Sequence, residues 1–180
     1  MEKKDYKPKY LRNSIIVLLI IAVVASFSYF VIIRKVNYNL GESYYLARLY
    51  EDAIIKLKPL GNYQDSRSLY IRSLYRQGEI YYESTNYMMA LEKFEELKDI
   101  LPETDLLITD TKYMMAVLEG VNQRYDESER LLNELDGYAK CNELIEAAKS
   151  TSVEPFITEN RNHVIAMDFK SVIELYLNSK

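Results

Sequence analysis

The sequence has very few of the residues on which several classes of functional site depend. It has one cysteine, which excludes an internal disulfide and any metal site built from several cysteines. Its single histidine excludes the usual zinc clusters and two-histidine chemistry. Five glycines, four prolines and no tryptophan in 180 residues disfavour a fold rich in strands and tight turns. We therefore expect no cofactor, no metal ion and no catalytic activity.

What the sequence does contain is a globular composition with an uneven charge. Hydrophobic residues make up 48% and charged residues 28%, which argues against a disordered chain, and there are 17 tyrosines. Residues 1–12 carry a net charge of +3, whereas residues 36–180 carry −9. An acidic body repels phosphate backbones, so this layout favours a membrane as partner and disfavours nucleic acid.

An uncharged apolar run follows the basic N-terminus. No charged residue occurs between Asn13 and Ile33, and the 19 residues from Ile15 to Ile33 would form a helix of about 28 Å, close to the hydrocarbon thickness of a bilayer. A buried core helix is a poor alternative, because this run has no polar face. We expect a basic tail over residues 1–13 and a transmembrane anchor in the lipid bilayer over residues 14–35.

A cleavable signal peptide is the main alternative to this anchor. The small residues before Ser26 could be a cleavage site, but the apolar run is longer than the usual hydrophobic region of a signal peptide. Five Lys or Arg residues precede the span and two follow it directly. This asymmetry predicts a single-pass protein of the cell membrane, with a cytoplasmic N-terminus and the remaining chain on the other side.

The body of the chain repeats itself at a spacing of 37 to 38 residues. Tyrosines stand at the same point of three successive segments: Tyr50, Tyr87 and Tyr125. A small residue follows three positions later: Ala53, Ala90 and Ser128. A large apolar residue comes four positions after that: Leu57, Phe94 and Leu132. Nine positions before each tyrosine is another small residue: Gly41, Gly78 and Ala116.

This recurrence is typical of helical hairpins, because two antiparallel helices approach closely only where side chains are short. The pattern predicts three close contacts: Gly41 with Ala53, Gly78 with Ala90, and Ala116 with Ser128. One hairpin buries too little surface alone, so successive hairpins would stack. We expect an all-α fold, with about three hairpins forming an α-solenoid over residues 36–150.

The same residues resemble the tetratricopeptide repeat family. The family's first helix has a small residue followed by tyrosine three positions later, as in Gly41 with Tyr44 and Gly78 with Tyr81. The period is longer than the family's usual 34 residues, the consensus tryptophan is absent, and Glu119 replaces the tyrosine in the third repeat. The resemblance implies a non-catalytic scaffold that binds proteins.

Helical periodicity and turn residues predict the individual elements. We expect helices over 37–49, 52–60, 65–84, 87–98, 105–122, 125–135 and 139–149, the last of which would cap the stack. Residues 151–180 would form an irregular segment up to about residue 163, followed by a short amphipathic helix with no predictable docking site.

The first helices of such a solenoid line its concave face, where a protein or peptide partner would bind. Aromatic and arginine side chains are the favoured interface anchors. The candidate partner-binding residues are Tyr38, Glu42, Tyr45, Arg72, Tyr75, Arg76, Glu79, Tyr82 and Tyr113. Two alternatives remain open: the tyrosines pack between neighbouring repeats, and Arg72 and Arg76 form ion pairs with Glu79 or Asp65.

Two other groups of residues suggest chemistry only superficially. The acidic cluster Glu92, Glu95, Glu96 and Asp99 lacks the loop and glycine of an EF-hand, so we expect a solvated helix face. Cys141 and His163 have no orienting motif around them, and we expect a buried cysteine and a surface histidine. The alternative to a binding scaffold is a structural spacer or a homo-oligomerisation module without a separate ligand.

Overall fold

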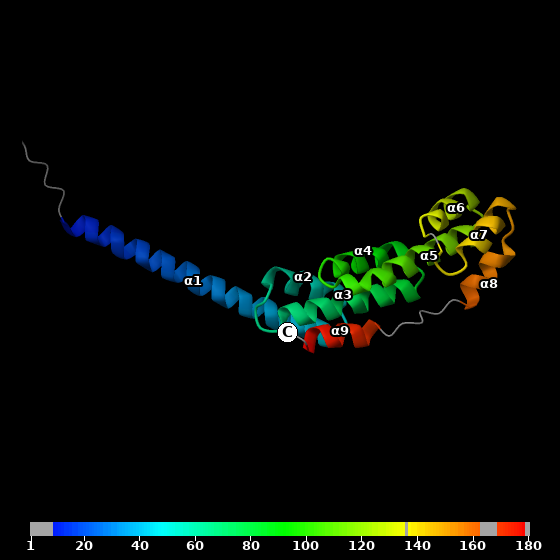
Figure 1. Cartoon of the computed structure of the whole chain (residues 1–180). Coiled ribbons are helices and arrows are strands. Elements are labelled where there is room, and N and C mark those ends of the chain that lie inside the picture. Colours follow the sequence, from blue (N-terminus) through cyan, green and yellow to red (C-terminus); the bar gives the residue numbers. More distant parts are fainter. Residues whose placement is uncertain (1–8, 136, 163–168, 179–180) are drawn as a thin grey trace, which may run out of the picture.

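The computed structural model describes residues 9–135, 137–162 and 169–178, and within these ranges every regular element is a helix. Figure 1 shows a long N-terminal helix that projects away from a row of packed helices. The expectation of an all-α fold is therefore confirmed.

Helix α1 (Lys9–Leu46) runs without interruption from the basic tail into the first hairpin. At about 1.5 Å per residue its 38 residues extend for about 57 Å, longer than the thickness of a bilayer. The segment Asn13–Leu46 is long and apolar enough to cross a membrane, with a window of mean hydropathy 3.0 of which no residue is buried. The predicted boundary at residue 35 is thus not a break in the backbone.

The remaining helices follow in hairpins. They are α2 (Tyr50–Leu57), the 3₁₀ turn η1 (Lys58–Leu60), α3 (Ser66–Glu83), α4 (Tyr87–Lys98), the 3₁₀ turn η2 (Pro102–Thr104), α5 (Asp105–Val121), α6 (Tyr125–Asn133), α7 (Cys141–Lys149), α8 (Glu154–Asn162) and α9 (Phe169–Asn178). From α1 to α8, each α-helix packs against the next one in the chain (Figure 1). Helix α8 also packs on α5. The seven helices predicted between residues 37 and 149 agree with the structure to within a few residues at each end, except that the first continues back into the anchor.

The repeat is visible in the backbone of the turns. Each hairpin turn contains one residue with positive φ, at Arg48, Thr85 and Gln123, two positions before the repeated tyrosine. Each turn also has the same backbone hydrogen bond between residues five positions apart, for example from Asn86 N to Tyr81 O at 2.9 Å. The turn between α7 and α8 repeats this geometry at Thr151, with Ser152 N donating to Ala147 O at 2.9 Å. Helices α7 and α8 therefore form a fourth hairpin.

This fourth hairpin corrects the prediction that residues 151–163 are irregular, because Glu154–Asn162 is helical. The segment is polar and follows Ser and Thr residues, a pattern that is typical of a loop. Pro155 is compatible with a helix because its position in the first turn requires no intrahelical N–H. Phe156 and Glu159 lie one turn apart, and both side chains are buried.

Small residues lie where the paired helices meet, and the large residue of the second helix packs on each glycine. A Cβ atom on Gly41 would lie 2.6 Å from the Leu57 side chain, and one on Gly78 would overlap the Phe94 ring. Any larger residue would have to displace these side chains. In the third hairpin Ser128 Oγ donates a hydrogen bond to Ala116 O at 2.7 Å, as the predicted contact requires.

Candidate functional site

The candidate site lies on the first helices of the hairpins, on the surface opposite the second helices. We call this surface the first-helix face and define it by α3, α5 and residues 36–46 of α1. Two C-terminal helices lie against it: α8 packs on α5, and α9 packs on α3 (Figure 1).

Three of the predicted contact residues are buried here. Tyr38 is 8% exposed, Tyr75 is 7% exposed and Tyr113 is fully buried. The Tyr38 ring meets Tyr63 edge-on with ring centres 6.0 Å apart, and Tyr113 meets Tyr138 in the same way at 5.6 Å. These two pairs are 75 residues apart, which is two repeats. For these residues the structure has the packing that the first alternative describes.

Tyr82 bonds across the hairpins. Its hydroxyl donates to Asp110 Oδ2 at 2.6 Å, and the Tyr138 hydroxyl donates to Asp110 Oδ1 at 2.9 Å. Burial raises the pKa of the Tyr82 phenol, and the hydrogen bond to Asp110 raises it further. The same two causes raise the pKa of Tyr138. The Asp110 carboxylate therefore joins α3, α5 and the turn before α7.

Tyr113 makes the corresponding bond to α8. Its hydroxyl donates to Glu159 Oε1 at 2.8 Å, and the second Glu159 oxygen lies 2.9 Å from Lys140 Nζ. Glu159 is only 7% exposed. Burial raises the pKa of the Tyr113 phenol, with a further contribution from Glu159. A buried carboxylate with a tyrosine and a lysine as partners fixes α8 on α5.

The third hairpin lacks one aromatic ring that the first two have. Tyr45 packs on Tyr50 and Tyr82 packs on Tyr87, with ring centres 5.8 and 5.1 Å apart. The equivalent first-helix position in the third hairpin is Gly120. Phe156 of α8 fills this space: it is fully buried, its ring centre lies 6.2 Å from that of Tyr125, and a Cβ atom on residue 120 would overlap its ring. Thus α8 completes the core of the third hairpin.

Three of the remaining candidate residues, Tyr45, Arg72 and Arg76, lie beside α9. Arg72 binds Glu174 through two bonds, from Nε to Oε1 at 3.1 Å and from Nη2 to Oε2 at 2.9 Å. Arg76 pairs with Glu79 at 2.7 Å, as one predicted ion pair has it. A cavity of about 240 Å³ remains beside α9, lined by Tyr45, Arg72, Tyr75, Arg76, Ile173 and Glu174. Glu42 is exposed on α1.

Within residues 173–178 of α9, one side chain is buried against the face. Ile173 is 2% exposed and joins the core of the first two hairpins, against which Tyr176 and Leu177 are partly buried. Leu175 points to solvent and is 71% exposed. The final amphipathic helix is therefore confirmed, and its docking site on α3, which the sequence left open, is now defined.

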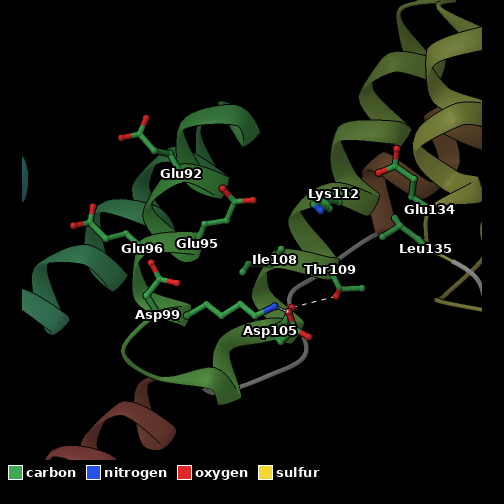
Figure 2. A pocket seen from close by; sticks show the side chains of 11 residues that line it. Glu92, Glu95, Glu96, Asp99, Asp105, Ile108, Thr109, Lys112, Glu134 and Leu135 are labelled. Carbon is green, nitrogen blue, oxygen red and sulfur yellow. Dashed lines mark hydrogen bonds and ion pairs between the residues drawn. The ribbon is translucent and has the colours of Figure 1, made fainter.

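The predicted acidic cluster on α4 borders an open groove between α4 and α5. Figure 2 shows Glu95 on α4 pointing toward α5 across a groove of about 750 Å³, whereas Glu92 and Glu96 on the same helix point away from α5. Glu96 is bound by Lys58 and by the Tyr70 hydroxyl. Burial alone would raise the pKa of Glu96, but these two hydrogen bonds outweigh it and lower the pKa. Lys98 bridges to Asp105 at 2.6 Å.

The other side chains considered for chemistry are not assembled into a site. No group of three or more His, Cys, Asp or Glu residues in the part of the chain that the structure describes is arranged to hold a metal ion. Cys141 is buried at the start of α7, with its Sγ 3.8 Å from Leu135 O. His163, which we expected at the surface, lies outside the described residues.

Comparisons with protein families, curated proteins and solved structures found no match to this chain. The resemblance to tetratricopeptide repeats therefore stays a prediction based on the repeated residues, and the site has to be interpreted from its own geometry.

Sequence reasoning missed the two C-terminal contacts with the first-helix face. Arg72 and Glu174 are 102 residues apart, and no local pattern links them. For α8 a signal did exist: the tyrosine of Tyr45 and Tyr82 is replaced by Gly120, which predicts a space that another element must fill.

Proposed function

We propose that this protein is a membrane-anchored, non-catalytic scaffold that binds a helical segment of another protein on its first-helix face. The observation that carries the proposal is the docking of α9 on α3 through Ile173 and the Arg72–Glu174 pair. A separate helix joined to α8 by residues 163–168 uses the side chains that an interface helix would use, an aliphatic anchor and a bidentate ion pair.

The anchor gives this surface its place in the cell. Residues 14–35 would lie in the bilayer, with the N-terminus cytoplasmic and the hairpins on the other side. Because α1 continues into the first hairpin, the two would move as one body. Arg34 supports this attachment: its guanidinium donates to Leu60 O at 3.0 Å and lies 4.7 Å from the centre of the Tyr63 ring. A surface held next to the membrane meets membrane-bound partners at a raised effective concentration.

A structural spacer or homo-oligomerisation module is the second candidate, favoured by the burial of Tyr38, Tyr75 and Tyr113. Here the tyrosines only join the hairpins and no separate ligand exists. Sedimentation of the full chain in detergent separates the two candidates. A stable oligomer whose interface includes Glu42 and Arg76 favours the second one.

Photo-crosslinking in intact membranes tests the binding function. A photoreactive amino acid at Glu42, which is exposed on α1, should crosslink to a second protein. The same amino acid at Met88, which is 71% exposed on α4, serves as the matched control. Arg76→Glu should remove the product formed from position 42. Identical products from both positions, or products that Arg76→Glu leaves unchanged, would contradict the proposed function.

Protease accessibility tests the topology separately. Protease added to intact cells should cleave the exposed hairpin turns and leave the N-terminal tail protected. Protection of the hairpins, with cleavage only after the membrane is opened, would reverse the proposed orientation.

A further inference from the structure

Helices α8 and α9 both cover the first-helix face, but they are held very differently. Phe156 of α8 is fully buried, and Glu159 is bonded within the core. In contrast, among the side chains of α9 that the structure describes, residues 173–178, Ile173 is buried and Tyr176 and Leu177 are partly buried. The ion pair of α9 has side chains that are 31% and 40% exposed. A half-exposed ion pair contributes little to stability because water screens it.

The weak attachment of α9 has to offset the loss of conformational freedom of a ten-residue helix. Short helices in water are only marginally stable without tertiary contacts. The docked and undocked forms of α9 are therefore close enough in free energy for a competing ligand to exchange them.

The surface beneath α9 has the chemistry of a helix-binding groove. Tyr45, Tyr75 and Arg72 line the cavity beside α9 together with Arg76. Aromatic and arginine residues are the usual anchors of protein interfaces. The cavity of about 240 Å³ beside Ile173 has room for a further side chain.

We infer that α9 is a displaceable internal ligand, and that the groove on α3 accepts an amphipathic helix from another protein that carries an aliphatic residue followed directly by glutamate. The aliphatic side chain takes the place of Ile173, and the glutamate pairs with Arg72. Aromatic or aliphatic residues three and four positions later take the places of Tyr176 and Leu177. This inference rests on the proposed function and names the chemistry of its partner and the competitor for its site.

The test uses the full chain in lipid nanodiscs and a fluorescent peptide with the sequence of residues 169–178. In the intact chain the resident α9 competes with this peptide. Ile173→Asp in the chain should release α9 while leaving the groove unchanged, so the peptide should bind at least tenfold more tightly. Leu175→Asp is the matched control on the same helix, because that side chain is exposed, and its peptide affinity should equal that of the intact chain.

A second release variant keeps the core side chains of α9 in place. Glu174→Arg in the chain removes only the ion pair, and it should also raise the peptide affinity. Adding Arg72→Glu to the Ile173→Asp chain should weaken binding of the original peptide, because two glutamates then face each other. A peptide that carries arginine at position 174 should then restore binding, which merely structural damage at Arg72 would not allow.

Three results would overturn the inference. Equal peptide affinity for the intact chain and both release variants would show that α9 does not cover the groove. Absence of binding to every release variant would show that the groove accepts no separate helix. Dissociation of a dimer by Ile173→Asp would assign α9 to the groove of a second copy.

These failures are distinguishable from failure of the proposed function. Crosslinking from Glu42 that depends on Arg76 would still support a binding scaffold if the peptide experiment failed, since it does not require α9 to move.

Discussion

The two helices that return to the first-helix face, α8 and α9, differ in how completely their side chains are enclosed. The distal helix α8 fills a space in the third hairpin that Gly120 creates, and its buried carboxylate bonds to Tyr113. Helix α9 lies on the first two hairpins, whose aromatic positions are filled by Tyr45 and Tyr82. Helix α8 is therefore part of the core, whereas α9 is an added layer over a core that is already complete.

The largest expected effect is on α8. Phe156→Ala should lower the free energy of unfolding by about 3–5 kcal/mol, since it removes a fully buried ring and leaves a cavity against Gly120. Urea unfolding of the full chain in detergent, followed by circular dichroism, measures this loss. Ile173→Ala is the matched change in α9, and it should lower the stability of the hairpins by less than about 1 kcal/mol because α9 can detach without unfolding them. Equal losses would remove the distinction between the two helices.

A smaller effect is expected from the bond that holds α8. Tyr113→Phe keeps the ring but removes the hydroxyl that donates to the buried Glu159, so the stability should fall by about 1–3 kcal/mol. The same unfolding measurement applies. Tyr125→Phe is a suitable control, because the Tyr125 ring packs on the same Phe156. A loss from Tyr113→Phe no larger than that from the control would show that the bond does not hold α8.

Alkaline pH should weaken the same region. The pKa of Tyr113 is raised in the folded chain by burial and by Glu159, so above the ordinary tyrosine pKa of about 10 the unfolded chain loses this proton first. The stabilising contribution is fully present below pH 10 and declines as the pH rises, by about 1.4 kcal/mol per pH unit for this group. Unfolding curves between pH 9 and 11 measure how steeply the free energy of unfolding falls with pH. Tyr113→Phe should remove its share, and an unchanged slope in that variant would contradict the assignment.

The smallest effect on stability is expected at the ion pair of α9. Arg72→Glu should change the free energy of unfolding by no more than about 1 kcal/mol, because the pair is partly exposed. It should nevertheless speed hydrogen exchange in α9 selectively. The double variant Arg72→Glu with Glu174→Arg should restore slow exchange, and failure of this charge reversal to do so would show that the pair does not position α9.

Much of the fold could be predicted because its determinants are local. Gly41, Gly78 and the repeated tyrosines mark helix contacts and helix starts within one repeat, and the observed helices begin at Tyr50, Tyr87 and Tyr125. The large residue four positions after each small residue of the second helix, Leu57 or Phe94, lies where a Cβ atom on the glycine would be, in keeping with the predicted pattern of small and large residues. The contacts between the glycines and the alanines stay predictions.

The candidate site was less predictable because it depends on α8 and α9 folding back onto α5 and α3, which are distant in the sequence. Burial of Tyr75 and Tyr113 could not be separated from exposure by sequence, since tyrosine is common in both environments. The pairing of Arg72 with Glu174 depends on the path of the chain after α8, for which no periodic pattern exists.

Hydrogen exchange of the full chain in nanodiscs, measured by mass spectrometry, directly tests whether α9 detaches while α8 stays in the core. The amides of α8 should exchange as slowly as those of α5, because the two helices share a core and open together. The amides of α9 should exchange much faster than those of α3, and they should exchange faster still in Ile173→Asp. Protection of α9 equal to that of α3 and α8 would mean that α9 is a fixed part of the fold, and the account of a displaceable helix would be wrong.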